Sequence, residues 1–255
     1  MTAAPPVIDT GAAWRALHAA ATDPYRQAGS FAWHFARGKL GRDPVFRGLV
    51  ERGLIGAQRT RVLDIGCGQG LFVSLLAAMS DMQAQGRWPA AWAPTPASAT
   101  YTGIELMPRD IERATRSLGH IAPAPHFVCG DMCTADFPGC DLVVILDVLH
   151  YVDLQAQEDV LRRVRDALAP SGRLLLRVGD AASRRGFAIS QWVDRTVTRI
   201  RGHRVSPTWG RTVADWRALL ERLGFAVQAL PMSEGTPFAN VLLVADLGAP
   251  SETPP

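Results

Sequence analysis

A glycine-rich stretch at residues 62–70 (VLDIGCGQG) is the pattern in this chain that points most strongly to chemistry. Its apolar start predicts a buried strand, its glycines a tight turn, and the apolar residues beyond it a helix. Glycine adopts positive φ readily and lets a ligand reach the backbone, while a helix N-terminus favours a carboxylate or a phosphate. Nicotinamide and flavin sites use similar turns, so the loop predicts a ligand without naming it. Its candidate binding residues are Asp64, Gly66, Cys67, Gly68 and Gly70.

Glu105 and Leu106 end a second apolar stretch, residues 101–106. A carboxylate at the end of a strand can accept hydrogen bonds from both hydroxyls of a ribose. Glu105 lies farther from Gly70 than the roughly 20 residues expected of a dinucleotide fingerprint. The proline-containing stretch between them accounts for the excess, so a ribose remains the ligand that we expect at Glu105.

Two later apolar stretches also end in polar residues. Asp131 and Met132 follow residues 126–129, and there Asp131 can accept a hydrogen bond from an adenine amino group while Met132 packs on the ring. Asp147 follows residues 142–146. Each of these sequences is of the type found at the ligand-binding edge of an open α/β sheet.

From residue 61 onward, short apolar runs alternate with amphipathic stretches, which predicts strands alternating with helices. The fold class expected is therefore α/β, with a mostly parallel sheet covered by helices on both faces. The carboxyl ends of parallel strands share one edge, where the candidate residues should gather. The expected strands are 62–65, 101–106, 126–129, 142–146 and 173–178, and the expected helices are 71–79, 109–118 and 155–168.

The regions outside this core are expected to form additions to it. Residues 1–57 form an N-terminal helical cap in this interpretation, and residues 58–247 form the main domain. Two insertions, 81–100 and 181–212, interrupt the alternation of strands and helices. The elements expected after them are a helix at 213–223, strands at 225–230 and 239–245, and a disordered tail at 248–255.

Four ligand-type sequences at four successive strand ends are much harder to obtain by chance than any one of them. In this order residues 61–180 resemble, motif by motif, the class I S-adenosylmethionine-dependent methyltransferases. The resemblance implies a Rossmann-like, doubly wound sheet of seven strands with the last strand antiparallel. It also implies that the cofactor is S-adenosylmethionine.

The resemblance also implies a role for each candidate residue. Asp64 and the glycines would hold the methionine part of the cofactor and Glu105 the ribose. Asp131 and Met132 would bind the adenine. Cys67, Leu106 and Asp147 complete the expected cofactor-binding set.

His150 and Tyr151, which follow the fourth expected strand, are the candidate catalytic residues. A neutral imidazole suits a general base near pH 7, and a base helps when the acceptor is a hydroxyl or an acidic carbon. Methyltransferases that act on nucleobase amines typically have a shared motif after the fourth strand. It is an Asn or Asp followed by two prolines and an aromatic residue. Residues 147–150 (DVLH) depart from that pattern, which argues against a nucleobase amine as the acceptor and leaves a ribose hydroxyl open. The expected reaction is O- or C-methylation.

The methyl acceptor is expected to lie under segments that combine aromatic and cationic residues, at 31–39 and within the second insertion. The second insertion is either a solvated basic surface or a lid for an anionic small molecule or for an acceptor on an acidic carrier protein. As a whole, the chain also resembles stand-alone methyltransferases of polyketide and aryl-polyene pathways. The insertion's arginines and tryptophans are Trp192, Trp209, Arg184, Arg185, Arg195, Arg199, Arg201, Arg204 and Arg211.

Composition limits the partners of the chain. With 255 residues, 47% of them hydrophobic, and a net charge of +3, the chain can bury a sizeable core and does not call for a nucleic acid or a membrane as partner. We find no basic segment followed by an apolar run at the start and no apolar run of about 18 residues, so we expect a soluble, cytoplasmic protein. Its four cysteines do not have the spacing of a zinc site, and we expect reduced thiols.

Two alternatives to a methyltransferase remain at this point. A nucleotide-binding oxidoreductase would need its ribose acid nearer the glycine loop and a tyrosine–lysine or similar pair, and Lys39 is the sole lysine of the chain. A non-catalytic relative could keep the fold and the cofactor pocket. Calorimetric titration with S-adenosylmethionine, its demethylated product and NAD separates the methyltransferase from the oxidoreductase.

Overall fold

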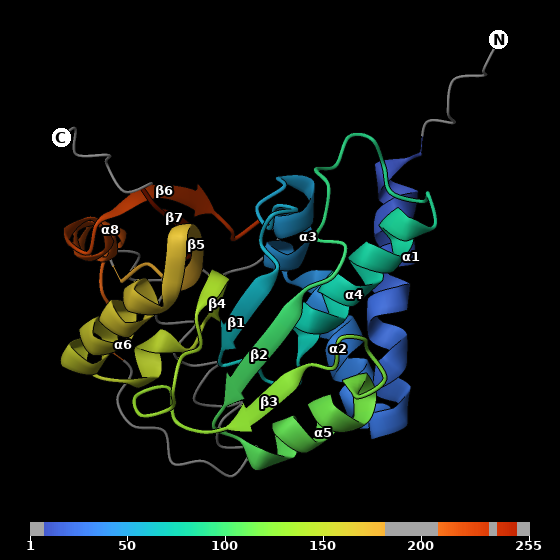
Figure 1. Cartoon of the computed structure of the whole chain (residues 1–255), viewed down its shortest axis with the longest axis horizontal. Helices are drawn as coiled ribbons and strands as arrows, with labels where there is room; N and C mark the ends of the chain where they lie inside the picture. The colour runs from blue at the N-terminus through green and yellow to red at the C-terminus, as the bar shows by residue number, and fades with distance from the viewer. Residues whose placement is uncertain (1–7, 182–208, 235–238, 249–255) are drawn as a thin grey trace. The chain divides into compact units, whose positions relative to one another are not determined.

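A computed structural model describes residues 8–181, 209–234 and 239–248 of the chain (Figure 1). These residues belong to two compact units. The first unit contains residues 1–60 and 67–129, and the second contains residues 61–66 and 130–255.

Seven strands form the sheet, in the order β3-β2-β1-β4-β5-β7-β6. In the second unit β1 pairs with β4 and β4 with β5 in parallel, while β7 runs antiparallel to both β5 and β6; in the first unit β2 and β3 are parallel. The expected α/β class and the antiparallel last strand are thereby confirmed. The strands are β1 (Arg61–Ile65), β2 (Thr100–Glu105), β3 (His126–Cys129), β4 (Cys140–Leu146), β5 (Leu168–Gly179), β6 (Phe225–Pro231) and β7 (Asn240–Leu247).

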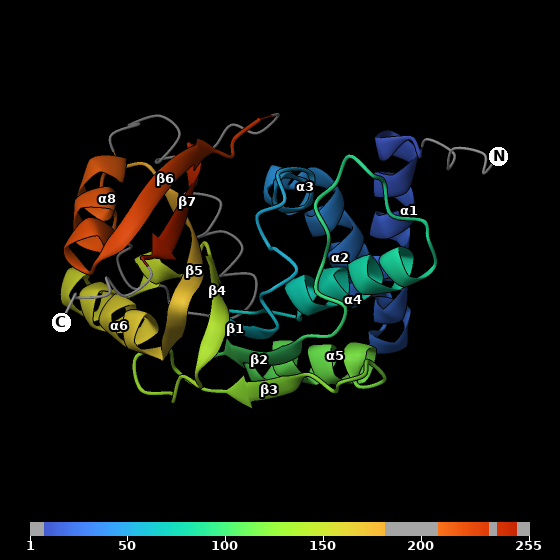
Figure 2. The ribbon, with the colours of Figure 1, turned by 45° about the horizontal axis from the view of Figure 1, so that its top comes forward.

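The first unit begins with the helices that were expected at the N-terminus. They are α1 (Thr10–Thr22), the 3-10 helix η1 (Asp23–Ala28), α2 (Ser30–Arg42) and α3 (Pro44–Glu51), followed after β1 by α4 (Leu71–Ala84) and after β2 by α5 (Pro108–Leu118). The buried face of α1, which includes Leu17 and Ala21, packs on α4. A hydrogen bond of 2.6 Å from the Ser74 hydroxyl to the Ala21 carbonyl joins these two helices. Figure 2 shows α5 alongside β2 and β3.

The second unit has its core in the middle of the sheet, where the side chains of residues 142–145 on β4 are fully buried. Its helices are η2 (Leu149–Tyr151), α6 (Leu154–Ala167) and α8 (Val213–Arg222). Helix α8 starts with a capping box, in which Thr212 and Asp215 satisfy each other's backbone N–H groups. Figure 2 shows α8 beside β6, with which it packs.

Two element boundaries differ by more than two residues from those that the sequence predicts. Helix α4 continues to Ala84 instead of ending at Met79, since residues 80–84 contain neither glycine nor proline and Met82 is buried. Strand β5 begins at Leu168, which was expected to end a helix, and it includes residues 169–172, where a loop was expected. Ser171 adopts a left-handed conformation (φ 63°), and the pairing with β4 shifts register just there, so a bulge replaces the loop.

No helix among the residues that the structure describes has the length and hydropathy needed to cross a membrane.

Candidate functional site

The glycine loop after β1 has the backbone that its sequence predicts. Gly66, Gly68 and Gly70 have φ values of 75°, 55° and 74°, in the left-handed region that favours glycine. A Cβ on Gly66 would lie 2.5 Å from Val148, and one on Gly70 would lie 2.8 Å from Leu118, so protein side chains occupy the space beside both. A Cβ on Gly68 would meet no atom within 4 Å. Gly68 is therefore the position of the loop where a ligand can approach the backbone.

Glu105 lies against this loop in the first unit. Its Oε2 accepts a hydrogen bond of 2.9 Å from the Gly68 N–H, and its Oε1 accepts one of 2.9 Å from the Met107 N–H. Burial raises the pKa of the Glu105 carboxyl, and the N–H donors of Met107 and Gly68 act in the opposite direction. Each carboxylate oxygen has two lone pairs, so Glu105 can also accept hydrogen bonds from a diol. The structure brings Gly68 and Glu105 together, as the sequence predicts.

Two neighbouring candidates differ in exposure. The Cys67 side chain is buried, and its Sγ would lie 2.8 Å from a Cβ on Gly103. The thiol therefore packs against β2, while the Cys67 N–H donates to the Ile104 carbonyl at 3.1 Å. Leu106 is 64% exposed immediately after Glu105. An apolar side chain so exposed beside a polar group is available to cover a bound ligand.

A buried tyrosine of the N-terminal cap, which sequence reasoning missed, also contacts the loop. The Tyr25 hydroxyl of η1 donates to the Gln69 carbonyl at 2.9 Å. The Gln69 side chain donates to Asp110 of α5 at 3.3 Å, and Asp110 pairs with Arg113 at 2.9 Å. The sequence signal for this contact was a single tyrosine within a polar stretch (residues 23–28, DPYRQA). If such a tyrosine is buried, its hydroxyl needs a hydrogen-bond partner.

The aromatic residues of α2, which were expected to cover the acceptor, stack with arginines. Phe31 is 54% exposed and lies under the Arg113 guanidinium, 4.6 Å from the ring centroid. Trp33 has guanidinium groups over its ring at 4.0 Å (Arg26) and 4.9 Å (Arg37). This part of the first unit therefore presents a surface of flat rings and positive charge.

In the second unit, the two predicted acids at the ends of β1 and β3 have different environments. Asp64 is 4% exposed near the end of β1. Asp131 is exposed and begins a turn, in which its Oδ1 accepts a hydrogen bond of 2.8 Å from the Cys133 N–H. Met132 beside it is half-buried. The Asp131 carboxylate can accept a further donor from a ligand.

Asp147 at the end of β4 is held by an arginine that sequence reasoning missed. Its backbone is left-handed (φ 62°), which is costly for a residue other than glycine. Its carboxylate forms a bidentate pair with Arg177, whose side chain is 1% exposed on β5. The pair fixes the direction in which the chain leaves β4, and the Asp147 N–H also donates to the Arg177 carbonyl at 3.3 Å.

The two candidate catalytic residues lie next to each other in η2. The rings of His150 and Tyr151 have centroids 4.2 Å apart, and the His150 Nε2 atom is buried. The Trp209 N–H donates to the His150 carbonyl at 2.9 Å. This bond connects the end of the second insertion to the candidate base.

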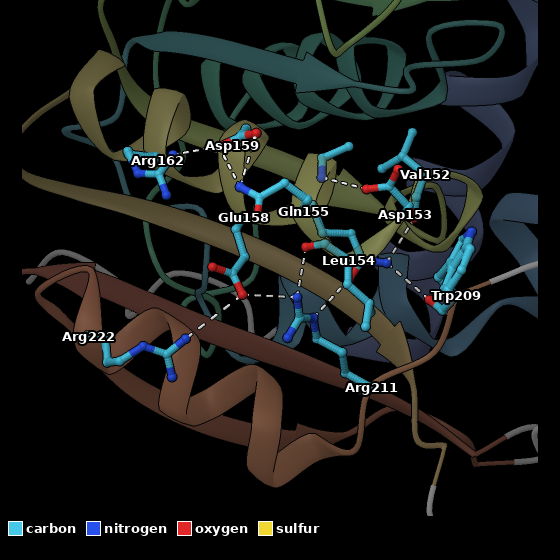
Figure 3. A network of polar contacts seen from close by, with 12 residues as sticks. Val152, Asp153, Leu154, Gln155, Glu158, Asp159, Arg162, Trp209, Arg211 and Arg222 are labelled. Atoms are coloured by element: carbon cyan, nitrogen blue, oxygen red, sulfur yellow. Dashed lines mark hydrogen bonds and ion pairs between the residues drawn. The ribbon is translucent and has the colours of Figure 1, made fainter.

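The polar network of Figure 3 fixes this end of the insertion to the start of α6. The fully buried Gln157 donates to the Trp209 carbonyl at 3.0 Å and accepts from the Arg211 Nε at 2.9 Å. Arg211 also donates to the Leu154 carbonyl at 2.8 Å and pairs with Glu158 at 3.1 Å. The remaining tryptophan and arginines that were named for the predicted lid lie outside the described residues. They are Trp192, Arg184, Arg185, Arg195, Arg199, Arg201 and Arg204.

The cysteines are free thiols, and Cys67 and Cys140 are buried. Burial raises the pKa of the Cys140 thiol to about 12. Within the described ranges, no three His, Cys, Asp or Glu side chains are grouped as a metal site requires.

Comparison with known proteins identifies the family. The sequence profile of a methyltransferase domain matches residues 32–230, which is most of the chain. The chain belongs to this methyltransferase domain family. The match contains β1 to β5, β6 up to its last residue but one, and every candidate residue discussed above except Tyr25, Arg26 and Phe31.

Curated relatives match this methyltransferase domain over part of their length. Acetylserotonin O-methyltransferase of Mus musculus is 36% identical over 104 residues, which are 41% of this chain and 26% of that protein. Carboxy-S-adenosyl-L-methionine synthase of Chromohalobacter salexigens is 30% identical over 130 residues, which are 49% of this chain and 43% of that protein. The aligned parts are thus less than half of either relative.

Solved structures share the fold at low sequence identity. Magnesium protoporphyrin IX methyltransferase of Synechocystis, with bound S-adenosylhomocysteine, has a TM-score of 0.56 and 18% identity over 94% of this chain and 100% of its own. Human N-acetylserotonin methyltransferase, in complex with S-adenosylmethionine, has a TM-score of 0.54 and 17% identity over 93% and 67%. Mitomycin 7-O-methyltransferase has a TM-score of 0.54 and 23% identity over 93% and 67%.

Proposed function

We propose that this chain transfers the methyl group of S-adenosylmethionine to an oxygen atom of a small-molecule acceptor. The observation that carries the proposal is the bond between Glu105 and the Gly68 N–H, in a loop where the space beside Gly68 is open. Membership of the methyltransferase domain family supports it. The names of two related proteins, acetylserotonin O-methyltransferase and mitomycin 7-O-methyltransferase, favour oxygen as the acceptor atom.

The residues present fit the cofactor part by part. Glu105, with its two acceptor oxygens near Gly68, would hold the ribose hydroxyls, and the exposed Leu106 would cover them. Asp131 would accept from the adenine amino group while Met132 packs on the ring. The backbone of the glycine loop would hold the methionine part, together with Asp64 near the end of β1. Asp147 would border the cofactor at the end of β4, where Arg177 holds its carboxylate.

Transfer requires a nucleophile in line with the methyl carbon at about 3 Å and a site that excludes water. The bound cofactor supplies a methyl group that its sulfonium has already activated. His150 would accept the proton that the acceptor hydroxyl loses, and Tyr151, 4.2 Å from it between ring centroids, would limit the orientations of the imidazole. Replacing His150 by Gln should lower kcat by about 10² to 10⁴ while the affinity for S-adenosylhomocysteine stays unchanged. An unchanged kcat would exclude His150 as the base.

The acceptor is proposed as a free small molecule. Among the related proteins, those whose names include a methyl acceptor act on acetylserotonin, magnesium protoporphyrin IX and mitomycin. They give no support to a carrier-bound acceptor, and the arginines that suggested an anionic one lie largely outside the described residues. The rings of Phe31 and Trp33 with their stacked arginines offer a surface suited to a flat acceptor.

Calorimetric titration with S-adenosylmethionine, S-adenosylhomocysteine and NAD tests the cofactor. We expect the first two to bind and NAD not to bind. Replacing Glu105 by Ala should weaken both by about 1.5 to 3 kcal/mol, the range for hydrogen bonds to a charged group. Glu112→Ala is the matched control, because Glu112 is exposed on α5 and pairs only with Arg116 among the contacts described. Unchanged affinity in a folded Glu105→Ala variant would exclude the proposed ribose site.

Methyl transfer is tested separately from binding. Purified protein with labelled S-adenosylmethionine is offered a series of hydroxylated aromatic compounds, and labelled product and S-adenosylhomocysteine are measured together. Tight cofactor binding without turnover of any of them would favour the non-catalytic alternative. NAD binding in place of S-adenosylmethionine would favour the oxidoreductase.

A further inference from the structure

A single arginine of α6 holds the turn that follows β3. The Arg163 Nη1 donates to the carbonyls of Met132 and Cys133, each at 2.9 Å, and its Nη2 donates to the carbonyl of Ala135. The guanidinium also lies over the ring of Phe137, 4.1 Å from the centroid. One side chain thus satisfies three backbone acceptors of a segment that forms neither helix nor strand.

Asp131 occupies the opposite end of the same turn. Its Oδ1 accepts from the Cys133 N–H at 2.8 Å, and its carbonyl accepts from the N–H groups of Thr134 at 3.0 Å and Ala135 at 2.8 Å. A carboxylate therefore satisfies the N–H end of the turn and a guanidinium cation satisfies its carbonyl end. This is the same polarity as in a capped helical turn. Without Arg163, the three carbonyls need other partners and the orientation of Asp131 is no longer fixed.

We propose that Arg163 is a positioning residue, which holds Asp131 where its carboxylate distinguishes the amino group of adenine from an oxo group. The inference rests on the proposed function, because it presupposes that the turn binds the adenine of the cofactor. Arg163 acts through the turn, since its guanidinium is committed to the three carbonyls and to Phe137. A fixed carboxylate accepts a hydrogen bond from an amino group and repels an oxo oxygen, whereas a carboxylate free to turn away does neither.

The test compares S-adenosylhomocysteine with S-inosylhomocysteine, which has an oxo group in place of the amino group and a hydrogen on the adjacent N1, by calorimetry on the full chain. We expect the native chain to bind S-adenosylhomocysteine at least about tenfold more tightly, as one hydrogen bond to a charged acceptor allows. In Arg163→Met the preference should fall to about threefold or less, because the affinity for S-adenosylhomocysteine drops while that for S-inosylhomocysteine barely changes. A purely structural role would weaken both ligands equally.

Arg162→Met is the matched control. Arg162 is the next residue of α6, and it is exposed and pairs with Asp159 at 2.5 Å on the helix surface. Its replacement should leave the tenfold preference intact. Arg163→Lys keeps the charge but lacks the planar fork of donors, so its preference should lie between those of the native chain and Arg163→Met.

The outcomes separate this inference from the proposed function. Failure of the native chain to bind S-adenosylhomocysteine would overturn the proposed function and this inference with it. Equal binding of the two ligands by the native chain, or a native preference retained in Arg163→Met, would overturn this inference alone. If circular dichroism shows that Arg163→Met does not fold, the ratio in Arg163→Lys decides: a native value overturns the proposal and a reduced value supports it.

Discussion

At the scale of single residues, the candidate site depends on a few groups whose environment gives them a task. Glu105 is the clearest of these, because it fixes the glycine loop through Gly68 and still has acceptor capacity. Gly68 differs from Gly66 and Gly70 in that the protein leaves the space beside it open. Substitutions of these two residues should therefore change ligand affinity and the stability of the fold to different extents.

The affinity for S-adenosylhomocysteine should depend on pH through Glu105. Burial raises the pKa of this carboxyl above its ordinary value of 4.5. The folded chain therefore holds the proton more tightly than the unfolded chain, so the contribution of Glu105 to stability is full below pH 4.5 and is lost as the pH rises through the folded pKa. Folding thus favours the protonated carboxyl of Glu105, whereas ribose hydroxyls donate to the ionised carboxylate, so ligand binding favours the ionised form. Affinity should fall as the pH falls through the raised pKa.

Calorimetry at several pH values, in buffers of different ionisation enthalpy, measures this dependence and the proton that Glu105 releases on binding. The decline should begin above pH 4.5. Glu105→Gln should bind more weakly and show a flat profile across the same range. A profile in Glu105→Gln that parallels the native one would assign the dependence to another group.

Gly68→Val should abolish cofactor binding. Its φ of 55° strains any residue with a Cβ, at about 1 to 2 kcal/mol of stability, and the added methyl groups would enter the open space that a ligand needs. Gly224→Val is the matched control, since Gly224 has a φ of 89° and equally open surroundings between α8 and β6. Thermal melts should show similar losses in both variants, and titration with S-adenosylhomocysteine should show loss of binding in Gly68→Val alone. Retained binding would place the ligand elsewhere.

At the scale of elements, the sequence predicted what local periodicity determines and missed what distant contacts determine. The alternation of strands and helices and the glycine turn were predicted because each is encoded within about ten neighbouring residues. The bulge at Ser171 was missed because it depends on the pairing of β5 with β4. Three site contacts join residues far apart in the sequence and left no local pattern: Tyr25 to Gln69, Arg177 to Asp147, and Arg163 to the turn after β3.

The contact between η1 and the glycine loop should support cofactor binding. Tyr25→Phe removes the hydrogen bond to the Gln69 carbonyl, which should cost about 1 to 3 kcal/mol of stability because that carbonyl loses its buried partner. The affinity for S-adenosylhomocysteine should fall several-fold as the loop loosens. Thr22→Val is the control, since the buried Thr22 hydroxyl donates at 2.8 Å to His18 within α1. Equal affinity in both variants would limit Tyr25 to a structural role.

At the scale of the whole molecule, the fold and the proposed cofactor are far easier to read than the acceptor. The proposed cofactor-binding residues follow successive strands, so the sequence pattern of those strands is enough to predict them. An acceptor is recognised by parts outside that pattern, and the curated relatives share under half of their length with this chain. The surface of Phe31 and Trp33 was predicted as a cover for the acceptor, but the residue types alone did not predict its stacking with Arg113 and Arg26.

Cofactor binding should also stabilise the molecule as a whole. A ligand that binds the folded state alone adds about 2.7 kcal/mol when present at a hundred times its Kd. For a chain of this size each kcal/mol raises Tm by about 2 to 4 °C, so S-adenosylhomocysteine should raise Tm by about 5 to 10 °C. Scanning calorimetry with S-adenosylhomocysteine and, as control, an equal concentration of NAD measures the difference. Glu105→Ala should lose most of the shift because its Kd is higher at the same ligand concentration. A shift with NAD, or an undiminished one in Glu105→Ala, would contradict the assignment of the ribose to Glu105.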